Sequence, residues 1–186
     1  MDVDADKELI GRCLQNDSLA QKELYNRYAP RMYGICLRYA GHTLEAQDIL
    51  QEGFIRVFLQ LKQFRFQGSF ESWLRRIFIN TAITLANRER RFSYKEELPS
   101  NFKDDNDGLE GLSRLNTQEI LGLIQELPAG YRMVFNLFEV EGYTHKEIGR
   151  KLRISENTSK SQLFNAKRRL REKLTEYGND YGKERS

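Results

Sequence analysis

The chain has 186 residues, of which 39% are hydrophobic and 31% are charged. This length allows one ordinary domain or two small ones, and the modest apolar content favours small helical units over a single deep core. No run approaches the ~18 apolar residues of a membrane span, and the start "MDVDADKELI" lacks the basic and apolar regions of a secretory signal. We therefore expect a cytoplasmic protein without direct membrane insertion.

The charged residues are unevenly distributed, although the formal net charge is only +3. Five arginines and one glutamate lie between Arg75 and Arg91. Six acidic residues and two lysines lie between Ser93 and Ser113, whereas Thr158 to Lys173 holds six basic residues and one glutamate. Two basic segments therefore flank an acidic one.

Apolar residues recur at helical spacing almost throughout the chain. They predict a helix beginning near Leu9, a second over about 24–39, a third over about 44–61 and a fourth over about 70–91. Pro30 is expected to mark a break or a new start within the second. No alternation typical of strands stands out, so the predicted fold class is all-α.

The stretch "SYKEELPSNFKDDNDGLEG" interrupts this pattern with a proline, glycines and clustered acids. It predicts a flexible acidic linker over residues 93–114. Helices resume near Thr117. We therefore predict two small helical domains, residues 1–92 and residues 115–186.

The sequence offers no signature of catalysis. It contains no HExxH, no phosphate-binding glycine loop and no nucleophile elbow, and His145 near Glu141 and Glu147 lacks a further matching partner. Cys13 and Cys36 stand outside any CxxC pair and are expected to be structural thiols. We therefore expect no enzyme, no cofactor and no metal.

The stretch "YTHKEIGRKLRISENTSKSQLFNAKRRLREKL" has the pattern of a helix-turn-helix. Thr144 and Glu147 have the spacing of a capping box, and "RISEN" then breaks the helix, with Ser155 and Asn157 as candidate caps. The inner stripe of the following helix comprises Leu163, Ala166, Leu170 and Leu174. Its other faces present basic and amide side chains, which match the edges of bases and the phosphates of a major groove. A solvated basic face on an ordinary bundle is the alternative.

This stretch resembles the promoter-binding fourth conserved region of the extracytoplasmic-function sigma factors, the small two-domain members of the bacterial sigma-70 family. In the family, threonine, an apolar residue, a basic residue, serine and arginine usually open the recognition helix. Here Ser159 replaces the apolar residue, and Asn165 stands where arginine is common. The minus-35 contacts that the resemblance implies are Thr158, Lys160, Ser161, Gln162, Phe164, Asn165, Lys167 and Arg168.

Residues from about Leu24 to Arg91 resemble the second conserved region of the same family. The stretch "EAQDILQEGFIRVFLQL" is similar to its polymerase-binding helix, although an ordinary amphipathic helix would show the same spacing. The resemblance implies docking on the core RNA polymerase, at the clamp helices of the beta-prime subunit and on the beta subunit, with a polar rim around a modest apolar centre. The implied docking residues are Asp48, Gln51, Glu52 and Arg56.

The stretch "FRFQGSFESWLRRIFINTAI" combines aromatic rings, arginines and one asparagine around a Gly-Ser break. Helical spacing places Trp73, Arg76 and Asn80 along one flank. The predicted inward residues are Phe70, Leu74, Ile77, Phe78 and Thr81. Rings and guanidinium planes stack on unpaired bases, and amides bond to their edges, so the flank suits single-stranded DNA. Core packing of Trp73 and a surface amide at Asn80 are the alternatives.

The resemblance implies that this segment recognises the minus-ten element and captures a flipped base in the loop before the helix. Extrusion of a base costs a few kcal/mol, which the pocket must offset. Asn80 would contact the captured base, with three arginines near the backbone. The implied minus-ten contacts are Phe64, Arg65, Gln67, Gly68, Ser69, Trp73, Arg75, Arg76, Asn80 and Arg88.

Two other classes of protein fit the sequence less well. A response-regulator-like activator needs a βα receiver domain upstream, and an anti-sigma or adaptor protein would lack the base-reading face.

The acidic linker has two interpretations. In the family, the connector between the two domains threads the RNA exit path of the polymerase. A solvated tether between the domains is the alternative. We therefore predict a nucleoid-associated sigma factor that directs core polymerase to specific promoters and assists strand opening. Family members are often restrained by an anti-sigma protein, which is a possible further partner.

Overall fold

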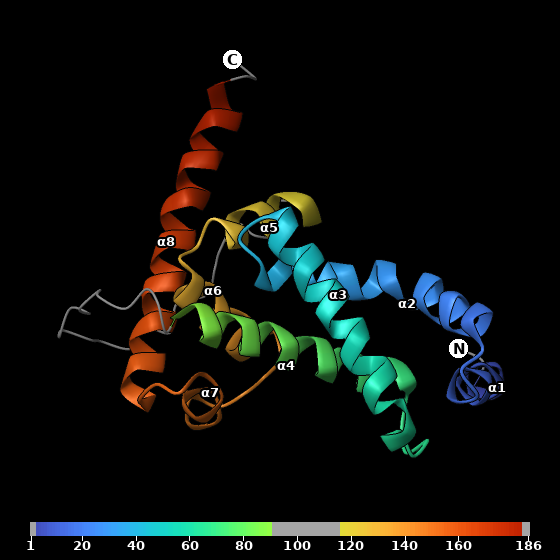
Figure 1. Ribbon diagram of the computed structural model, residues 1–186. Helices are drawn as coiled ribbons and strands as arrows, with labels where there is room; N and C mark the ends of the chain where they lie inside the picture. Colours follow the sequence, from blue (N-terminus) through green and yellow to red (C-terminus); the bar gives the residue numbers. More distant parts are fainter. Residues whose placement is uncertain (1–2, 91–115, 184–186) are drawn as a thin grey trace. The chain divides into compact units, whose positions relative to one another are not determined.

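The computed structural model describes residues 3–90 and 116–183, and all regular elements in these two ranges are helices (Figure 1). The predicted all-α class is confirmed. Internal contacts divide the chain into two compact units, Met1–Leu85 and Ala86–Ser186. The predicted linker over residues 93–114 and the domain boundaries at its two ends lie outside the described residues.

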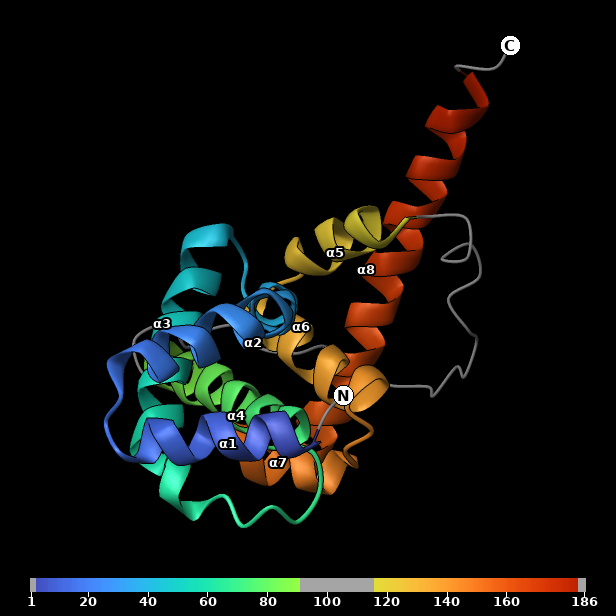
Figure 2. The ribbon, with the colours of Figure 1, turned by 90° about the vertical axis from the view of Figure 1, so that its right-hand side faces the viewer.

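Unit 1 is a small bundle in which α2 packs against α1 and α3 (Figures 1 and 2). Its elements are α1 (Val3–Leu14), α2 (Ser18–Tyr39), α3 (Thr43–Gln60), the 3₁₀ turn η1 (Leu61–Gln63) and α4 (Phe70–Arg90), whose last residues pass into the second unit. The residues predicted to face inward from α4 are all buried, Leu74, Phe78 and Thr81 completely so. The helical spacing therefore gave the correct core face of α4.

Side chains cap the helices of unit 1 at their N-termini. Asp17 accepts hydrogen bonds from the backbone N–H groups of Leu19 and Ala20 at the start of α2. These bonds, the one from Ala20 first, together with the Arg12 guanidinium, lower the pKa of the Asp17 carboxyl. His42 caps α3 by accepting from the N–H of Glu45. The tight turns between α1, α2 and α3 are thus fixed by local hydrogen bonds.

The interpretation of Pro30 as a break is wrong, because α2 continues through it from Ser18 to Tyr39. Proline removes the N–H that would bond to the carbonyl of the residue four positions earlier, here Asn26. Both Asn26 and Pro30 lie on the exposed face of α2, where water can bind that carbonyl. The buried residues before and after Pro30, Tyr28 and Met32, hold the helix against the core.

The two cysteines are buried in the core of unit 1. Burial raises the pKa of the Cys13 thiol, and it raises that of Cys36 to about 12. Thiols of this kind are poor nucleophiles at neutral pH, as expected for structural residues. Among the described helices, none is long and apolar enough to cross a membrane.

Unit 2 is built on the long helix α8. Its elements are α5 (Thr117–Gln125), α6 (Ala129–Phe135), the π turn η3 (Asn136–Val140), α7 (His145–Leu152) and α8 (Glu156–Lys183). Both α6 and α7 pack against α8 around Val134, Leu137 and Ile148. The buried Arg132 donates to the carbonyls of Gln125 and Leu127, which lie at the end of α5 and just after it. A charged side chain thereby satisfies backbone acceptors at this helix end.

Gly53 of α3 lies directly against a buried ring of α4. A Cβ atom added at Gly53 would lie 2.2 Å from Cε1 of Phe78, whose ring is completely buried. Phe54, the next residue, makes an edge-to-face contact with the same ring at 5.2 Å between centroids. Glycine is therefore required at this crossing, because the ring has no free space into which it can move.

We expect Gly53→Ala to destabilise unit 1 by about 1–3 kcal/mol through overpacking. The check is denaturant unfolding followed by the fluorescence of Trp73, the only tryptophan, which lies in this unit. Gly34→Ala in α2 is the matched control, since nothing lies within 4 Å of its added Cβ, and it should stabilise by roughly 0.5–1 kcal/mol. Equal effects of the two substitutions would contradict the assigned close packing.

Candidate nucleic-acid and polymerase interface

The segment between η1 and α4 has an unusual backbone. Phe66 adopts a positive φ of 57°, and Gly68 has a φ of 95°. A left-handed conformation is strained for a bulky residue such as phenylalanine, and such strain concentrates at functional sites. Ser69 then begins α4, since its Oγ accepts from the N–H of Ser72 at 3.1 Å. The loop is thus turned sharply before the helix starts.

Four aromatic side chains gather at this loop. The ring of Phe64 contacts those of Phe66, Phe70 and Trp73, with centroids 4.9, 5.1 and 5.5 Å away. Phe70 also stacks on Trp73 and makes an edge contact with the buried Tyr28. The Phe66 ring is 43% exposed, whereas Phe70 is buried. One aromatic cluster therefore extends from the core to the surface.

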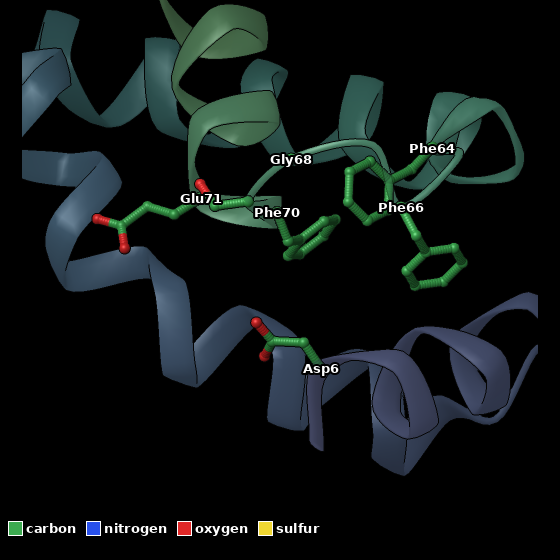
Figure 3. Close-up of a pocket in the computed structure, with 7 residues that line it drawn as sticks. Asp6, Phe64, Phe66, Gly68, Phe70 and Glu71 are labelled. Atoms are coloured by element: carbon green, nitrogen blue, oxygen red, sulfur yellow. The ribbon is translucent and has the colours of Figure 1, made fainter. Parts of the chain in front are cut away.

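A pocket of about 70 Å³ opens beside this cluster. Figure 3 shows the rings of Phe64, Phe66 and Phe70 on one side of it and the side chain of Asp6, from α1, on the other. Gly68 and Ser69 from the loop and Glu71 from α4 complete the lining. A single buried water needs a cavity of ~10–15 Å³. The pocket can therefore hold a group the size of several waters.

Arginines of α2 hold both carboxylates of the lining. Arg27 donates to Oδ1 of Asp6 at 3.2 Å, and Arg31 donates to Oε2 of Glu71 at 2.7 Å. The Asp6 carboxylate is 17% exposed. Burial raises the pKa of the adjacent Tyr28 hydroxyl, and the nearness of Asp6 raises it further. The α2 arginines therefore hold both carboxylates in place at the mouth of the pocket.

The predicted flank of α4 is partly accessible. Arg76, Asn80 and Arg88 are exposed, whereas Trp73 and Arg75 are half-buried. Asn80 does not line the pocket. It lies ten residues after Phe70, which is ~15 Å along a helix. The contact of Asn80 with a captured base therefore stays a prediction.

The exposed face of α3 carries apolar as well as polar residues. Asp48 and Gln51 are exposed, as predicted from their spacing. Glu52 and Arg56 are half-buried and form an ion pair with each other at 2.8 Å. Three apolar side chains lie on the same line as Asp48 and Gln51, at steps of three and four, and are at least half exposed: Leu44, Ile55 and Leu59.

The helix-turn-helix of unit 2 is formed by α7 and the beginning of α8. Thr144 and Glu147 make the predicted capping box, in which each side chain accepts from the backbone N–H of the other residue. Arg153, at the end of α7, adopts a left-handed conformation with a φ of 56°. Ser155, not Asn157, caps α8 by accepting from the N–H of Thr158 at 2.9 Å.

Two residues of the predicted minus-35 set are not on the outer faces of α8. Gln162 and Asn165 are each 6% exposed, and Ser159 is completely buried. Gln162 lies between Ser159 and Ala166 on one helical stripe, so the buried face is wider than its apolar residues indicate. The outward placement of Gln162 and Asn165 is therefore wrong. Asn165 retains one link to the surface, since Arg168 donates to its Oδ1 at 3.3 Å.

The remaining predicted contacts of α8 are at least partly accessible: Thr158, Lys160, Ser161, Phe164, Lys167 and Arg168. Two of the lysines form ion pairs within unit 2, Lys160 with Glu156 at 3.0 Å and Lys167 with Glu139 at 2.7 Å. The Lys160–Glu156 pair is exposed and contributes little stability, so this lysine can exchange its carboxylate for another anion. The accessible surface of α8 is therefore basic, and Glu156 and Glu139 orient the ammonium groups of its two lysines.

Two family models match the chain. Residues 24–92 match sigma-70 region 2, and residues 117–170 match sigma-70 region 4. Together these models describe about two thirds of the chain. The chain belongs to the sigma-70 family.

Several relatives of the chain are extracytoplasmic-function sigma factors. SigE of Mycolicibacterium smegmatis is 30% identical over 164 residues, which cover 85% of this chain and 63% of that protein. SigW of Bacillus subtilis is 28% identical, covering 90% of this chain and 96% of that protein. The sigma-E factor of Haemophilus influenzae is 26% identical, covering 91% of this chain and 95% of that protein. The solved structure of CnrH in complex with the cytosolic domain of CnrY has 20% identity and a TM-score of 0.46, covering 92% of this chain and 97% of that one.

The chain is thus an RNA polymerase sigma factor of the extracytoplasmic-function type, which directs promoter-specific initiation of transcription. Sigma factors are not enzymes. Within the described residues, no group of three or more histidine, cysteine or acidic side chains is placed to hold a metal ion. Sites in this sigma factor are therefore considered as binding surfaces.

Sequence reasoning missed several residues of these surfaces. Phe66 lies in the loop before α4, and an aromatic residue in a polar loop could have indicated a contact surface. Ile55 and Leu59 fall outside the core stripe of α3, and their spacing with Leu44 along one line of the helix was the available signal of an exposed apolar patch. Asp6 of this sigma factor had no local signal, because only the packing of α1 brings it to a loop about sixty residues later.

The turn of the helix-turn-helix leaves no room for a side chain at Gly149. An added Cβ would lie 2.9 Å from the carbonyl oxygen of Ile154, whose N–H in turn donates to Gly149. We expect Gly149→Ala to destabilise unit 2 by about 1–3 kcal/mol, measured as faster hydrogen exchange of the α7 and α8 amides. Gly122→Ala in α5, with open space around its Cβ, is the control. Unchanged exchange in Gly149→Ala would refute the constraint.

Proposed function

We propose that this sigma factor divides its work among three surfaces: α3 docks on the core polymerase, the loop before α4 and the flank of α4 hold the unpaired minus-ten strand, and α8 binds the minus-35 element. The observation that carries the proposal is the aromatic pocket, which joins an exposed ring, a buried aromatic cluster and a polar wall at one loop. Duplex DNA does not require such a pocket, whereas an extruded base does.

The α3 face has the composition of a small protein interface. Leu44, Ile55 and Leu59 supply an exposed apolar line, and Asp48 and Gln51 lie within it. Interfaces commonly combine an apolar centre with polar residues that fix orientation. We infer that this face meets the clamp helices of the beta-prime subunit. The Glu52–Arg56 pair lies beside this face. Its two side chains bond to each other one turn apart and so stabilise α3 itself.

We expect Asp48→Lys to weaken binding to core polymerase roughly tenfold, because it reverses a charge within the docking face. Asp48 is preferable to Glu52 for this test, since reversal at Glu52 would also place two cations one turn apart on α3. Glu8→Lys, at an exposed acid of α1, is the matched control. The measurement is the fraction of sigma factor that co-purifies with limiting core polymerase. A normal fraction for Asp48→Lys would count against docking through α3.

The pocket and Asn80 are proposed to contact different nucleotides of the minus-ten element. The pocket takes a flipped base against the rings of Phe64 and Phe66. Arg76 and Asn80 form an exposed polar flank beyond it, where a guanidinium can stack or bind phosphate and an amide can read a base edge. Arg88 continues the same basic surface. This arrangement grips several nucleotides of one unpaired strand.

Asn80→Ala should reduce open-complex formation about tenfold, since one base-edge contact of this kind is worth ~1–3 kcal/mol. Binding to core polymerase should be unaffected, because Asn80 lies on α4 and not on the proposed docking face of α3. Permanganate footprinting of promoter DNA by reconstituted holoenzyme gives the readout. Asn26→Ala, at an exposed asparagine of α2, serves as control. A footprint as strong as that of the unchanged protein would remove Asn80 from the DNA surface.

The accessible residues of α8 are proposed to contact the minus-35 element. Lys160, Lys167 and Arg168 would bind phosphates, and Ser161 and Phe164 lie where a helix faces bases in a major groove. The ammonium groups of both lysines would exchange a carboxylate for a phosphate on binding. With these functions, the protein is expected to associate with the nucleoid together with the polymerase. An anti-sigma protein, of the kind named in the solved complex of RpoE with NepR, is a further proposed partner.

The test of the whole assignment is transcription in vitro with purified core polymerase on a genomic library, with start sites read by sequencing. The proposal predicts starts at a set of promoters that share two elements. Variants of the loop should lose strand opening, and variants of α8 should lose recognition of the upstream element only. Identical start sites for both groups of variants would refute the division of work.

A further inference from the structure

A hydrogen bond joins the two helices of the helix-turn-helix at the end of α7 opposite the turn. Nδ1 of His145, the first residue of α7, lies 2.9 Å from Oγ of Ser159 in the first turn of α8. α7 packs beside this part of α8 (Figure 1). The turn itself is fixed at the other end of α7, where the N–H of Ile154 donates to the carbonyl of Gly149. The two helices are therefore held together at two separate points.

The hydroxyl of Ser159 depends on this bond. Ser159 is completely buried, so it contacts neither solvent nor DNA directly. A buried hydroxyl without a partner costs ~1–3 kcal/mol, and the bond to His145 offsets that cost. In the family, an apolar residue is usual at this position, and apolar packing has no preferred direction. A hydrogen bond has a narrow range of lengths and angles. The serine therefore replaces undirected packing with a directed contact between the helices.

The imidazole of His145 is itself held in place. The ring of Phe138, from η3, stacks on it with centroids 4.5 Å apart and an angle of 21° between the ring planes. The preceding residue, Thr144, forms the capping box of α7 with Glu147. His145 thus connects three elements: η3 by stacking, α7 by its backbone and α8 by the hydrogen bond. A side chain locked by packing in this way can fix the position of the group that it bonds.

The separation of the two fixed points decides how strongly the bond controls the angle of α8. The eight residues of α7 extend over ~12 Å. A displacement of ~1 Å at the His145 end would turn α8 by about 5° relative to α7 over that length. Arg168 lies ~14 Å beyond Ser159 along α8, so the same rotation would move it by ~1 Å. A polar contact with DNA would then leave its normal range of lengths.

We propose that His145 is a positioning residue for DNA recognition: through Ser159 it fixes the angle at which α8 enters the major groove of the minus-35 element. The inference rests on the proposed binding of α8 to that element. Contacts of Ser161 and Phe164 with base edges require a defined geometry, whereas attraction to phosphates does not. Loss of the bond should therefore lower specific affinity and leave non-specific affinity unchanged.

The test is a double-mutant cycle in reconstituted holoenzyme. Affinity is measured for a duplex promoter that carries the minus-35 element and for one in which that element is scrambled. Ser159→Ala removes the hydroxyl that Nδ1 of His145 bonds, and His145→Phe removes the partner of the buried Oγ. We expect each substitution to lower the ratio of the two affinities about tenfold. The double variant removes both polar groups together, keeps a ring against Phe138 and should recover most of the ratio.

Two further measurements separate positioning from a merely structural effect of the bond. Titration with excess promoter gives the fraction of holoenzyme that binds, and we expect this fraction to stay unchanged while the dissociation constant rises. His145→Asn carries a polar atom at the same distance from the backbone as Nδ1, and it should retain most of the ratio although it lacks the stacked ring. Thr175→Ala is the matched control, because the hydroxyl that it removes bonds to the carbonyl of Arg171 within α8.

Three results would overturn the inference. The first is an unchanged ratio in Ser159→Ala, and the second is a double variant whose losses are the sum of the single ones. The third is a loss confined to the binding fraction, because the bond would then stabilise unit 2 without orienting α8.

Failure of the proposed minus-35 surface can be told apart from failure of this inference. Arg168→Ala removes an exposed cation of α8 and should weaken promoter binding. If neither Arg168→Ala nor the scrambled element changes the affinity, α8 does not bind the minus-35 element, and the inference falls with it. If both weaken binding while His145 and Ser159 show no coupling, only the inference is wrong.

Discussion

The packing of Gly53 against Phe78 determines where the functional surfaces of unit 1 can lie. Because Gly53 has no side chain, α3 can pack directly on the Phe78 ring of α4, which an added Cβ would overlap. Each helix then turns a different face outward. α3 exposes its apolar line around Ile55, and α4 exposes the flank that carries Asn80. A side chain at Gly53 would force the two helices apart and change the angle between these surfaces, which matters if α3 docks on the polymerase while α4 holds DNA, as proposed.

The loop before α4 stores strain next to a rigid aromatic cluster. A phenylalanine with positive φ costs of order 1–3 kcal/mol, which the contacts of Phe66 with Phe64 and the cap at Ser69 offset. The pocket is thus formed without a ligand, and the proposed capture of a base would lose little ordering entropy. Preformed geometry of this kind favours selection by shape and hydrogen bonding over adaptation to any base.

The sequence correctly predicted the features that depend on helical periodicity. It did not predict features that depend on packing between residues far apart in the chain. Every inward residue of α4 was identified correctly, since each turn repeats the same face. Pro30 failed because the exposed side of a helix tolerates a lost hydrogen bond. Gln162 was misplaced since the buried face of α8 includes polar positions. Asp6 was invisible, because no local pattern reports which loop a first helix will reach.

The charges around the pocket also explain how it could distinguish a base from the backbone that carries it. Asp6 and Glu71 repel phosphate from the pocket mouth, while ion pairs with Arg27 and Arg31 hold the two carboxylates in place and limit the range of their field. Arg76 and Arg88, on α4, attract the backbone along a separate path. A strand drawn to these arginines would present its bases, not its phosphates, to the rings. In the proposed function, the separation of the anionic pocket from the cationic flank would orient the strand before any base is read, which gives the acids a use in a DNA-binding surface.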